Sequence, residues 1–382
     1  MSTTLTCPRL LRDGALRGPG AVTIADGRIA AVHDAPPRAD DGSVTHLGEG
    51  LLTPGLVDLQ LNGAVGVDLA HADAAGWRRV AEHAARHGVT AFVPTFVTAP
   101  LDRLAAAVGA TVDAALDVRG RPVAQPLGAH LEGPFLSPGN PGAHPVDLLR
   151  VPDAAAVDAL LSGGTPLIVT LAPELEGADA AIDRLLGAGV HVSLGHSMAT
   201  AADAARAADR GVGLVTHLFN AQRAFGHREP GLPGRALVDE RLVSGLIADR
   251  VHVADEAVRL AFAAAAGRIA LVSDAVAAAG MAPGPFRLGP IEAFAAADGP
   301  PRLADGTLAG SALQLDEAVR NVAGLGVPAA AALDAATAVP AAAIGDDTRG
   351  RLAPGRRADL VWWDDALRVR AVWIAGERID PR

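Results

Sequence analysis

Short apolar runs and longer stretches rich in alanine and charged residues alternate over most of this chain. The runs are rich in β-branched residues and leucine, which is typical of buried strands, and the stretches between them have the length of single helices. Strands are predicted at 56–62, 90–95, 126–132, 167–171, 190–195, 214–217, 243–248 and 269–274. Helices are predicted between most of them, at 74–87, 101–117, 155–161, 178–186, 200–210 and 255–266.

Strands that alternate with helices form parallel sheets, and two α/β architectures are built in this way. Eight strands over a length near the ~250 residues typical of the fold favour a TIM-like (β/α)8 barrel. A doubly wound open sheet usually carries a glycine motif such as G-x-G-x-x-G where its first helix begins, and the sequence has no such motif. We therefore expect a barrel.

The two ends of the chain have a β periodicity that lies outside the barrel pattern. Near the start, Asp26-Gly27 separates two alternating runs, which is a strong hairpin signal. Near the end, 359–363 and 369–374 have the pattern of strands and contain tryptophans that we expect to fill a β core. We predict a small β domain formed by residues 1–52 and 344–382, a barrel at 53–343, and a Pro/Gly-rich excursion over its mouth at 283–306.

Composition narrows the classes of function. The net charge of -10 argues against a general nucleic-acid or membrane-surface binder, because both need a basic face. No uninterrupted apolar run reaches the ~18 residues that span a bilayer. The single cysteine, Cys7, excludes an intramolecular disulfide, and the start of the chain lacks the apolar region of a secretory signal, so we expect a cytoplasmic protein. The chain has no lysine, which excludes Schiff-base chemistry and a carbamylated-lysine metal bridge.

Polar side chains stand at the carboxyl ends of the predicted strands, where parallel barrels carry their chemistry. These residues are Gln60, Asn62, Glu132, His196, His217 and Asp274. Two histidines and one carboxylate with an open coordination position form a catalytic divalent-metal site, and zinc suits this set best. Such a metal lowers the pKa of water and polarises a carbonyl, and Asp274 is suited to accept the proton.

Each of these residues also has a purely structural interpretation. Either histidine could lie in the core with a backbone partner, and Asp274 could cap a helix. Strand alternation puts His130 and Glu132 on one face, where they could simply pair. The pattern alone leaves these alternatives open.

Several motifs resemble, in order along the chain, those of the N-acetylglucosamine-6-phosphate deacetylase family of the amidohydrolase superfamily. They occupy 54–63, 130–135, 194–196, 216–221, 228–231, 245–249, 273–275 and 306–311, and the tail 350–360 resembles the closing β segment of that superfamily. The resemblance implies a (β/α)8 barrel with a small β-sandwich built from both termini. It also implies a homodimer that hydrolyses the acetamide of a sugar phosphate.

The resemblance assigns roles to individual residues. It implies that Glu132, His196 and His217 bind one divalent metal, with Zn²⁺ preferred over Fe²⁺, Mn²⁺ or Co²⁺. Asp274 would be the catalytic acid and base, and His252 would hold the acetyl carbonyl. Arg228 would bind the sugar phosphate across the dimer interface, for which its planar fork is suited. The other substrate-contacting positions are Ala143, His144, Asn220, Ala221, Leu308, Ala309 and Gly310.

The chain departs from the family pattern in several loops. Gln60-Leu-Asn62 replaces the His-x-His with which many superfamily members hold a second metal, so we expect a one-metal site. Arg250 stands where the family usually has glycine, Gln222-Arg223 replaces Met-Pro, and the segment 275–280 differs. These changes could retune the sugar preference.

The expected reaction is hydrolysis of N-acetyl-D-glucosamine 6-phosphate to D-glucosamine 6-phosphate and acetate. Three alternatives remain: a deacetylase that prefers the galactosamine epimer, a cyclic amidohydrolase of the dihydroorotase or hydantoinase type, and a non-catalytic sugar-phosphate sensor. The absence of a His-x-His motif and of lysine argues against a cyclic amidohydrolase. The joint presence of the metal ligands and Asp274 speaks against the third.

Overall fold

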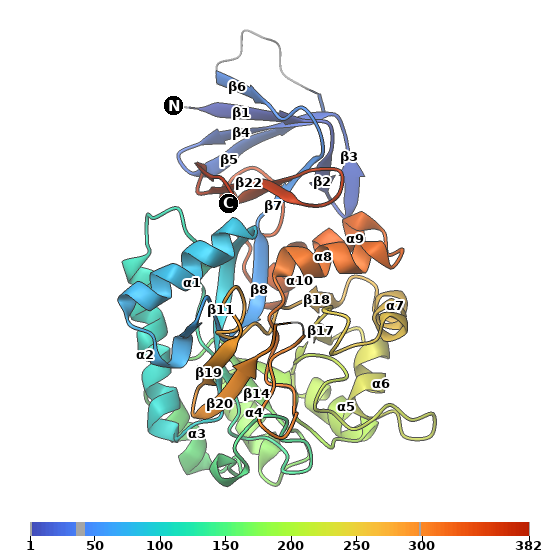
Figure 1. Cartoon of the computed structure of the whole chain (residues 1–382). Coiled ribbons are helices and arrows are strands. Elements are labelled where there is room, and N and C mark those ends of the chain that lie inside the picture. The colour runs from blue at the N-terminus through green and yellow to red at the C-terminus, as the bar shows by residue number, and fades with distance from the viewer. Residues whose placement is uncertain (1, 36–42, 298, 382) are drawn as a thin grey trace.

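The computed structural model describes residues 2–35, 43–297 and 299–381 (Figure 1). Its centre is a parallel sheet in which neighbouring strands follow the order β8-β11-β13-β14-β15-β16-β17-β18. They are β8 (Leu56–Leu61), β11 (Val89–Val97), β13 (His130–Glu132), β14 (Ile168–Leu171), β15 (His191–Leu194), β16 (Leu214–Val215), β17 (Val243–Leu246) and β18 (Ile269–Leu271). The segment after the last strand, β18, pairs with the end of the first strand, β8, and closes the sheet. The Asp274 amide donates to the Gln60 carbonyl over 2.9 Å, and the Asn62 amide donates to the Ala275 carbonyl over 2.7 Å. The predicted TIM-like barrel is confirmed.

Helices surround the sheet, and each buries one face against it (Figure 1). They are α1 (Ala74–Arg86), α2 (Leu101–Asp117), α3 (Ala154–Leu161), α4 (Ala178–Gly187), α5 (Ala201–Asp209), α6 (Gly231–Val238), α7 (Asp255–Ala264), α8 (Leu315–Gly324), α9 (Ala329–Asp334) and α10 (Ala338–Ala343). In α1, Trp77, Val80 and Ala84 are buried at the three- and four-residue spacing of one helix face. At the start of α5, Thr200 and Asp203 form a capping box.

Two elements differ from the sequence prediction. The predicted strand 126–132 is split into β12 (Gln125–Pro126) and β13. Between them lies Gly128 (φ 152°), where an added Cβ would lie 2.7 Å from the Leu167 Cβ. Helix α6 was not predicted, because its first residues, Gly-Leu-Pro-Gly, have the composition of a loop.

Strands from both ends of the chain form the small β domain. One sheet has the order β5-β4-β1-β6 and the other β23-β22-β21-β7-β2-β3. Their bounds are β1 (Thr3–Cys7), β2 (Leu10–Arg12), β3 (Ala15–Arg17), β4 (Gly20–Ala25), β5 (Arg28–His33), β6 (Ser43–His46), β7 (Leu51–Pro54), β21 (Leu360–Trp363), β22 (Val369–Ile374) and β23 (Glu377–Ile379). The sheets share an apolar cluster that includes Leu5, Val22, Leu360 and Trp373, so the predicted small β domain is confirmed. Asp26-Gly27 joins β4 to β5 as predicted, with φ of 50° and 71°.

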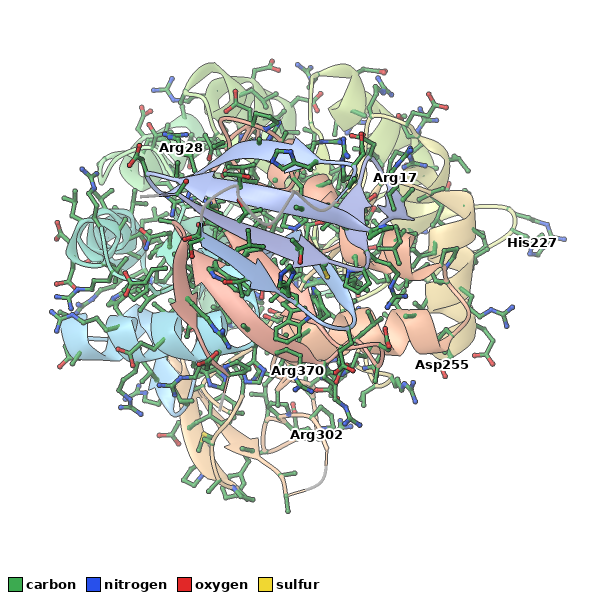
Figure 2. All side chains as sticks on the ribbon, turned by 90° about the horizontal axis from the view of Figure 1, so that it is seen from above. Arg17, Arg28, His227, Asp255, Arg302 and Arg370 are labelled. Carbon is green, nitrogen blue, oxygen red and sulfur yellow. The ribbon has the colours of Figure 1, made fainter. Side chains whose placement is uncertain are left out.

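The small β domain lies at the amino ends of the barrel strands, because β7 continues directly into β8. It is at the top of Figure 1 and faces the viewer in Figure 2. At the carboxyl ends, β19 (Gly284–Leu288) and β20 (Ile291–Ala295) form an antiparallel hairpin. Phe286 and Leu288 pack there against Val97 and Val276. Leu288 also lines the cavity at this end, which confirms the predicted excursion over the barrel mouth.

Shorter elements complete the described chain: β9 (Gly63–Ala64), β10 (Val67–Asp68), and the single-turn helices η1 (Leu69–His71) and η2 (Val146–Leu148). Among the described residues, no helix combines the length and the apolar character needed to cross a bilayer.

Candidate metal centre and its cavity

The polar side chains of the site lie at the carboxyl ends of the barrel strands, and the backbone conformation there sets their directions. Glu132 is the last residue of β13, and His196 and His217 each follow the end of a strand by two residues. His196 (φ 48°), His217 (φ 28°) and Asp274 (φ 48°) all have left-handed backbones. Each such residue costs about 1–3 kcal/mol and persists only where its surroundings impose it, which is common at functional sites.

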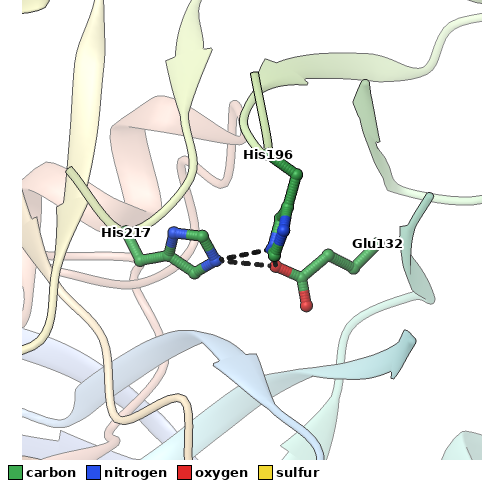
Figure 3. A group of neighbouring side chains, drawn as sticks. All are labelled: Glu132, His196 and His217. Atoms are coloured by element: carbon green, nitrogen blue, oxygen red, sulfur yellow. Dashed lines mark hydrogen bonds and ion pairs between the residues drawn. The ribbon is translucent and has the colours of Figure 1, made fainter. Parts of the chain in front are cut away.

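Glu132, His196 and His217 converge on one point (Figure 3). The Nε2 atoms of the two histidines lie 3.1 Å apart, and the Glu132 Oε1 atom lies 3.2 Å from the first and 2.9 Å from the second. All three side chains are buried, and their ligand atoms lie within 4.8 Å of one another. The group is consistent with a metal site.

The surroundings of the imidazoles fit a bound cation. The His196 Nδ1 atom lies 3.3 Å from the Asn140 carbonyl, so a proton on Nδ1 leaves the Nε2 lone pair directed at the cluster. Two nitrogens at 3.1 Å beside a carboxylate oxygen form an electron-rich pocket, which a divalent cation would neutralise. Burial by itself would raise the pKa of Glu132, but hydrogen bonds and positive charge from His196 and His217 outweigh it and hold the pKa well below its usual range.

His130 does not use Glu132 as its partner, although the two share a strand face. Its Nε2 atom lies 2.7 Å from the Thr170 hydroxyl, and its Nδ1 atom lies 3.3 Å from the Thr95 hydroxyl. Burial lowers the pKa of His130 to about 4, so the ring is neutral. The Glu132 carboxylate is therefore free to face the two histidine ligands.

Asp274 lies beside this cluster and is held by two amides. The Asn62 and Gln60 side chains donate to its Oδ1 atom over 2.9 and 3.0 Å, and the Gln60 amide also donates to Glu132 over 3.2 Å. Burial first, and then the negative charge of Glu132, raise the pKa of Asp274 to about 7. A carboxylate with this pKa can take up and return a proton near neutral pH.

One cavity of about 390 Å³ holds these side chains and most of the positions expected to contact substrate. It is lined by Glu132, His196, His217, Asp274, His252, Ala143, His144, Asn220, Ala221, Leu308 and Gly310. Ala309 is fully buried and packs with Phe286 and Leu288 in the apolar cluster beside the cavity. Arg228 is exposed and lies in the loop 222–230 outside the cavity of its own chain. The neighbouring His227 projects from the edge of the molecule (Figure 2).

Two further histidines face the cavity with defined partners. The His252 Nδ1 atom lies 2.6 Å from the Asp249 carboxylate, which leaves Nε2 as its remaining polar atom. The His144 Nδ1 atom accepts from the Thr98 amide over 3.1 Å, so its proton is on Nε2, which lies 3.8 Å from Glu132. Burial, followed by the charge of His196, lowers the pKa of His144 to about 3.

Sequence reasoning missed part of the cavity wall. Asn140, Gly142, Val97, Ile247, Leu288 and Thr307 also line it. Gly142 has a left-handed backbone (φ 56°), and an added Cβ there would lie 3.0 Å from the His196 ring, so both conformation and space favour glycine. The run Asn140-Pro-Gly142 signals a turn, but no periodic pattern says which way the turn faces.

A model of the amidohydrolase family matches residues 51–379. The chain belongs to this family. Among curated proteins, this amidohydrolase is 40% identical to N-acetylgalactosamine-6-phosphate deacetylase from Escherichia coli, over 99% of both chains. It is also 40% identical to N-acetylglucosamine-6-phosphate deacetylase from Bos taurus, over 86% of this chain and 83% of the bovine one.

Solved structures agree with the amidohydrolase assignment. N-acetylglucosamine-6-phosphate deacetylase from Pasteurella multocida superposes with a TM-score of 0.92 over the whole of both chains, at 28% identity. A mutant of N-acetyl-D-glucosamine-6-phosphate deacetylase from Mycobacterium smegmatis, in complex with N-acetyl-D-glucosamine-6-phosphate, superposes with a TM-score of 0.91 at 37% identity, over 99% of both chains.

Proposed function

We propose that this amidohydrolase removes the acetyl group from N-acetyl-D-glucosamine 6-phosphate and releases D-glucosamine 6-phosphate and acetate. The observation that carries the proposal is the meeting of Glu132, His196, His217 and Asp274 in one cavity. Relatives with about the same identity over most of the chain have this activity or that of the galactosamine epimer in their names.

Glu132, His196 and His217 would hold one divalent metal, and their two nitrogens and one oxygen favour zinc. When bound, the metal supplies Lewis acidity, which polarises the acetamide carbonyl and lowers the pKa of water. Gln60 and Asn62 lie at the end of the first barrel strand, where they donate to Asp274. Neither side chain offers an imidazole for a second metal. We therefore propose a one-metal site.

Asp274 acts as the acid and base in this mechanism. It accepts a proton from the water that attacks the acetamide carbon, and then gives a proton to the departing nitrogen. The Gln60 and Asn62 amides keep its carboxylate oriented throughout. The Asp249 carboxylate lies 2.6 Å from the His252 Nδ1 atom and fixes the ring, so that the Nε2 atom can contact the carbonyl oxygen as charge develops there.

The sugar would lie against Ala143, His144, Asn220, Ala221, Leu308 and Gly310, with the backbone around Ala309 completing that wall. We further propose a homodimer in which Arg228 binds the sugar phosphate in the neighbouring subunit. This proposal rests on the resemblance of the segment 228–231 to the family motif, and the exposure of Arg228 outside the cavity of its own chain agrees with it.

We also propose a division of the chain into a barrel at 53–343 and a small β domain made of 1–52 and 344–382. A separate apolar cluster supports it, since Leu5, Val22, Leu352 and Trp373 of the small β domain pack together. The barrel cluster reaches across these bounds to Ile344 and Trp363, which lie where the two parts meet.

A second candidate substrate is N-acetyl-D-galactosamine 6-phosphate. The relative that carries this activity in its name is matched over 99% of both chains, compared with 86% of this chain for the bovine glucosamine deacetylase. The two sugars differ only in the configuration of one hydroxyl, so the same centre can hydrolyse either.

Acetate release from the two N-acetylhexosamine 6-phosphates tests the proposal. We expect rapid release from the glucosamine substrate after incubation with zinc, and loss of activity after treatment with a chelator. A higher kcat/KM for the galactosamine epimer would assign the second function. Binding of both sugars without acetate from either would identify a sensor, and cleavage of cyclic imides alone would identify a cyclic amidohydrolase.

A metal titration tests the one-metal proposal. Metal-free protein should regain full activity after one equivalent of zinc, because among the described residues Glu132, His196 and His217 are the group whose ligand atoms lie close enough together to share a metal ion. A requirement for two tightly bound equivalents would contradict it.

A further inference from the structure

The loop that follows β16 is held by the side chain of one glutamine. The Gln222 Oε1 atom accepts from the Phe219 amide over 3.1 Å, and its Nε2 atom donates to the Thr216 carbonyl over 2.9 Å. The side chain is 7% exposed. Its amide therefore bridges backbone groups on both sides of the candidate ligand His217.

The backbone of this loop is strained. His217 (φ 28°), Phe219 (φ 76°) and Ala221 (φ 48°) are left-handed, although none is glycine. Residues other than glycine adopt this conformation at an energetic cost, so the loop needs other contacts to keep its shape. The two hydrogen bonds of Gln222 span this strained segment and supply such contacts.

The same segment forms part of the cavity wall. Asn220 and Ala221 line the cavity, whereas Gln222 does not. The Ala221 carbonyl accepts from the Ser197 amide over 3.0 Å, and the Arg223 amide donates to the Ser197 carbonyl over 2.9 Å. The loop that holds His217 is thereby joined to the loop that holds His196.

We infer that Gln222 is a positioning residue for the metal centre and the substrate wall. Without contacting substrate, it fixes the segment that aims His217 at the cluster and holds Asn220 and Ala221 against the sugar. The part that concerns the sugar rests on the proposed function. The part that concerns His217 depends only on the candidate metal site.

The test replaces Gln222 with methionine, which has a similar length and shape but forms neither backbone hydrogen bond. The family motif has methionine at this position too, but there it is followed by proline, whose fixed φ can hold the loop, whereas this chain has Arg223 and depends on the Gln222 amide. The matched control is Gln125→Met. The Gln125 amide also donates to backbone carbonyls, those of Val118 and Val123, but far from the cavity. A milder variant, Gln222→Asn, keeps an amide that is one methylene too short to reach both groups.

Three measurements separate positioning from general stability: zinc affinity by competition with a chromophoric chelator, KM and kcat for both sugar phosphates, and thermal unfolding. We expect Gln222→Met to weaken zinc binding roughly 10- to 100-fold. We expect it to lower kcat/KM by a similar factor with a raised KM. Gln222→Asn should lie between wild type and Gln222→Met, and Gln125→Met should change neither quantity.

If both Gln222 variants keep wild-type zinc affinity and KM, the inference is wrong. It is also wrong if Gln125→Met changes these quantities as much as Gln222→Met does. If wild type releases acetate from neither sugar, the proposed function fails, but the zinc measurement still decides the role of Gln222 at the metal centre.

Discussion

At the scale of single residues, burial gives two carboxylates of this barrel different properties. Glu132 is hydrogen-bonded to His196 and His217 and keeps its negative charge. Asp274 is buried beside that charge, and its pKa rises to about 7. The first carboxylate can bind a cation, and the second can exchange a proton near neutral pH.

Asp274→Asn should separate metal binding from catalysis. The variant keeps the shape of the side chain but cannot accept a proton, so we expect kcat to fall by roughly 10²- to 10⁴-fold. Zinc affinity should stay close to wild type, because Glu132, His196 and His217 are untouched. The check is acetate release beside chelator competition, and a near wild-type rate would exclude Asp274 as the base.

Asp58 provides a pH test outside the cavity. Its Oδ1 atom accepts from the Gln60 and Ser273 amides over 3.2 Å, and burial raises its pKa to about 6. Because the folded-state pKa is raised, the stabilising contribution of this group is complete below the unfolded pKa near 4 and is lost as the pH rises through 6. At about 1.4 kcal/mol for each pKa unit, the loss is about 3 kcal/mol.

Asp58→Asn should therefore gain stability relative to wild type as the pH rises from 4 to 6.5, by about 2 kcal/mol, because part of the full change falls outside this range. The asparagine oxygen can accept the same two amides without acquiring charge. Urea unfolding of both proteins across this pH range measures the difference in free energy. A difference that does not change with pH would show that Asp58 titrates normally.

At the scale of elements, Arg268 caps the carboxyl end of α6, the helix that the sequence pattern did not predict. The Arg268 guanidinium, just before β18, donates to the carbonyls of Ala236, Leu237, Asp239 and Leu242 over 2.8–2.9 Å. These carbonyls lie at the end of α6 and just beyond it, where the helix leaves acceptors without partners and a cation is favoured.

Arg268→Met should lower the free energy of unfolding by about 2–4 kcal/mol, because several carbonyls lose a charged donor at once. Arg259→Met is the control, because Arg259 lies on the exposed face of α7. Chemical denaturation of both variants gives the comparison. If both variants have the same free energy of unfolding, water donates to these carbonyls about as well as the Arg268 guanidinium does.

The elements also show how far sequence patterns reach. Helix α1 was predicted at 74–87 and spans Ala74–Arg86, because its buried positions have clear helical spacing. The polar residues at the strand ends were found for a similar reason, since parallel strands bring their carboxyl ends together. Sequence patterns missed the cavity residues Asn140 and Gly142 and the two backbone hydrogen bonds of Gln222. Tertiary contacts determine how these loops fold. The sequence predicted an excursion at 283–306 but not the paired strands within it, because the β19–β20 hairpin depends on packing against Val97 and Val276.

At the scale of the whole molecule, the metal centre joins three strands of the barrel. Its candidate ligands lie at the end of β13 and just after β15 and β16, so a bound cation would link distant parts of the sequence. Binding to the folded state alone adds about 4 kcal/mol at a free metal concentration 1,000 times Kd. We therefore expect zinc to raise Tm and a chelator to reverse the rise.

Glu132→Gln supplies the control for this prediction. The amide is a poorer ligand than the carboxylate, so most of the zinc-dependent rise in Tm should disappear. Differential scanning calorimetry with and without zinc measures the effect. The same rise in both proteins would indicate that zinc stabilises the fold from another position.

The shared sheet of the small β domain has a consequence for biosynthesis. Strand β7 pairs with β21, and Thr53 lies opposite Val361 in that ladder. A ribosome completes β7 long before it reaches β21, so the nascent chain carries an open strand edge while the entire barrel is being made. This edge of β7 can be covered only after Leu360–Trp363 have left the ribosome.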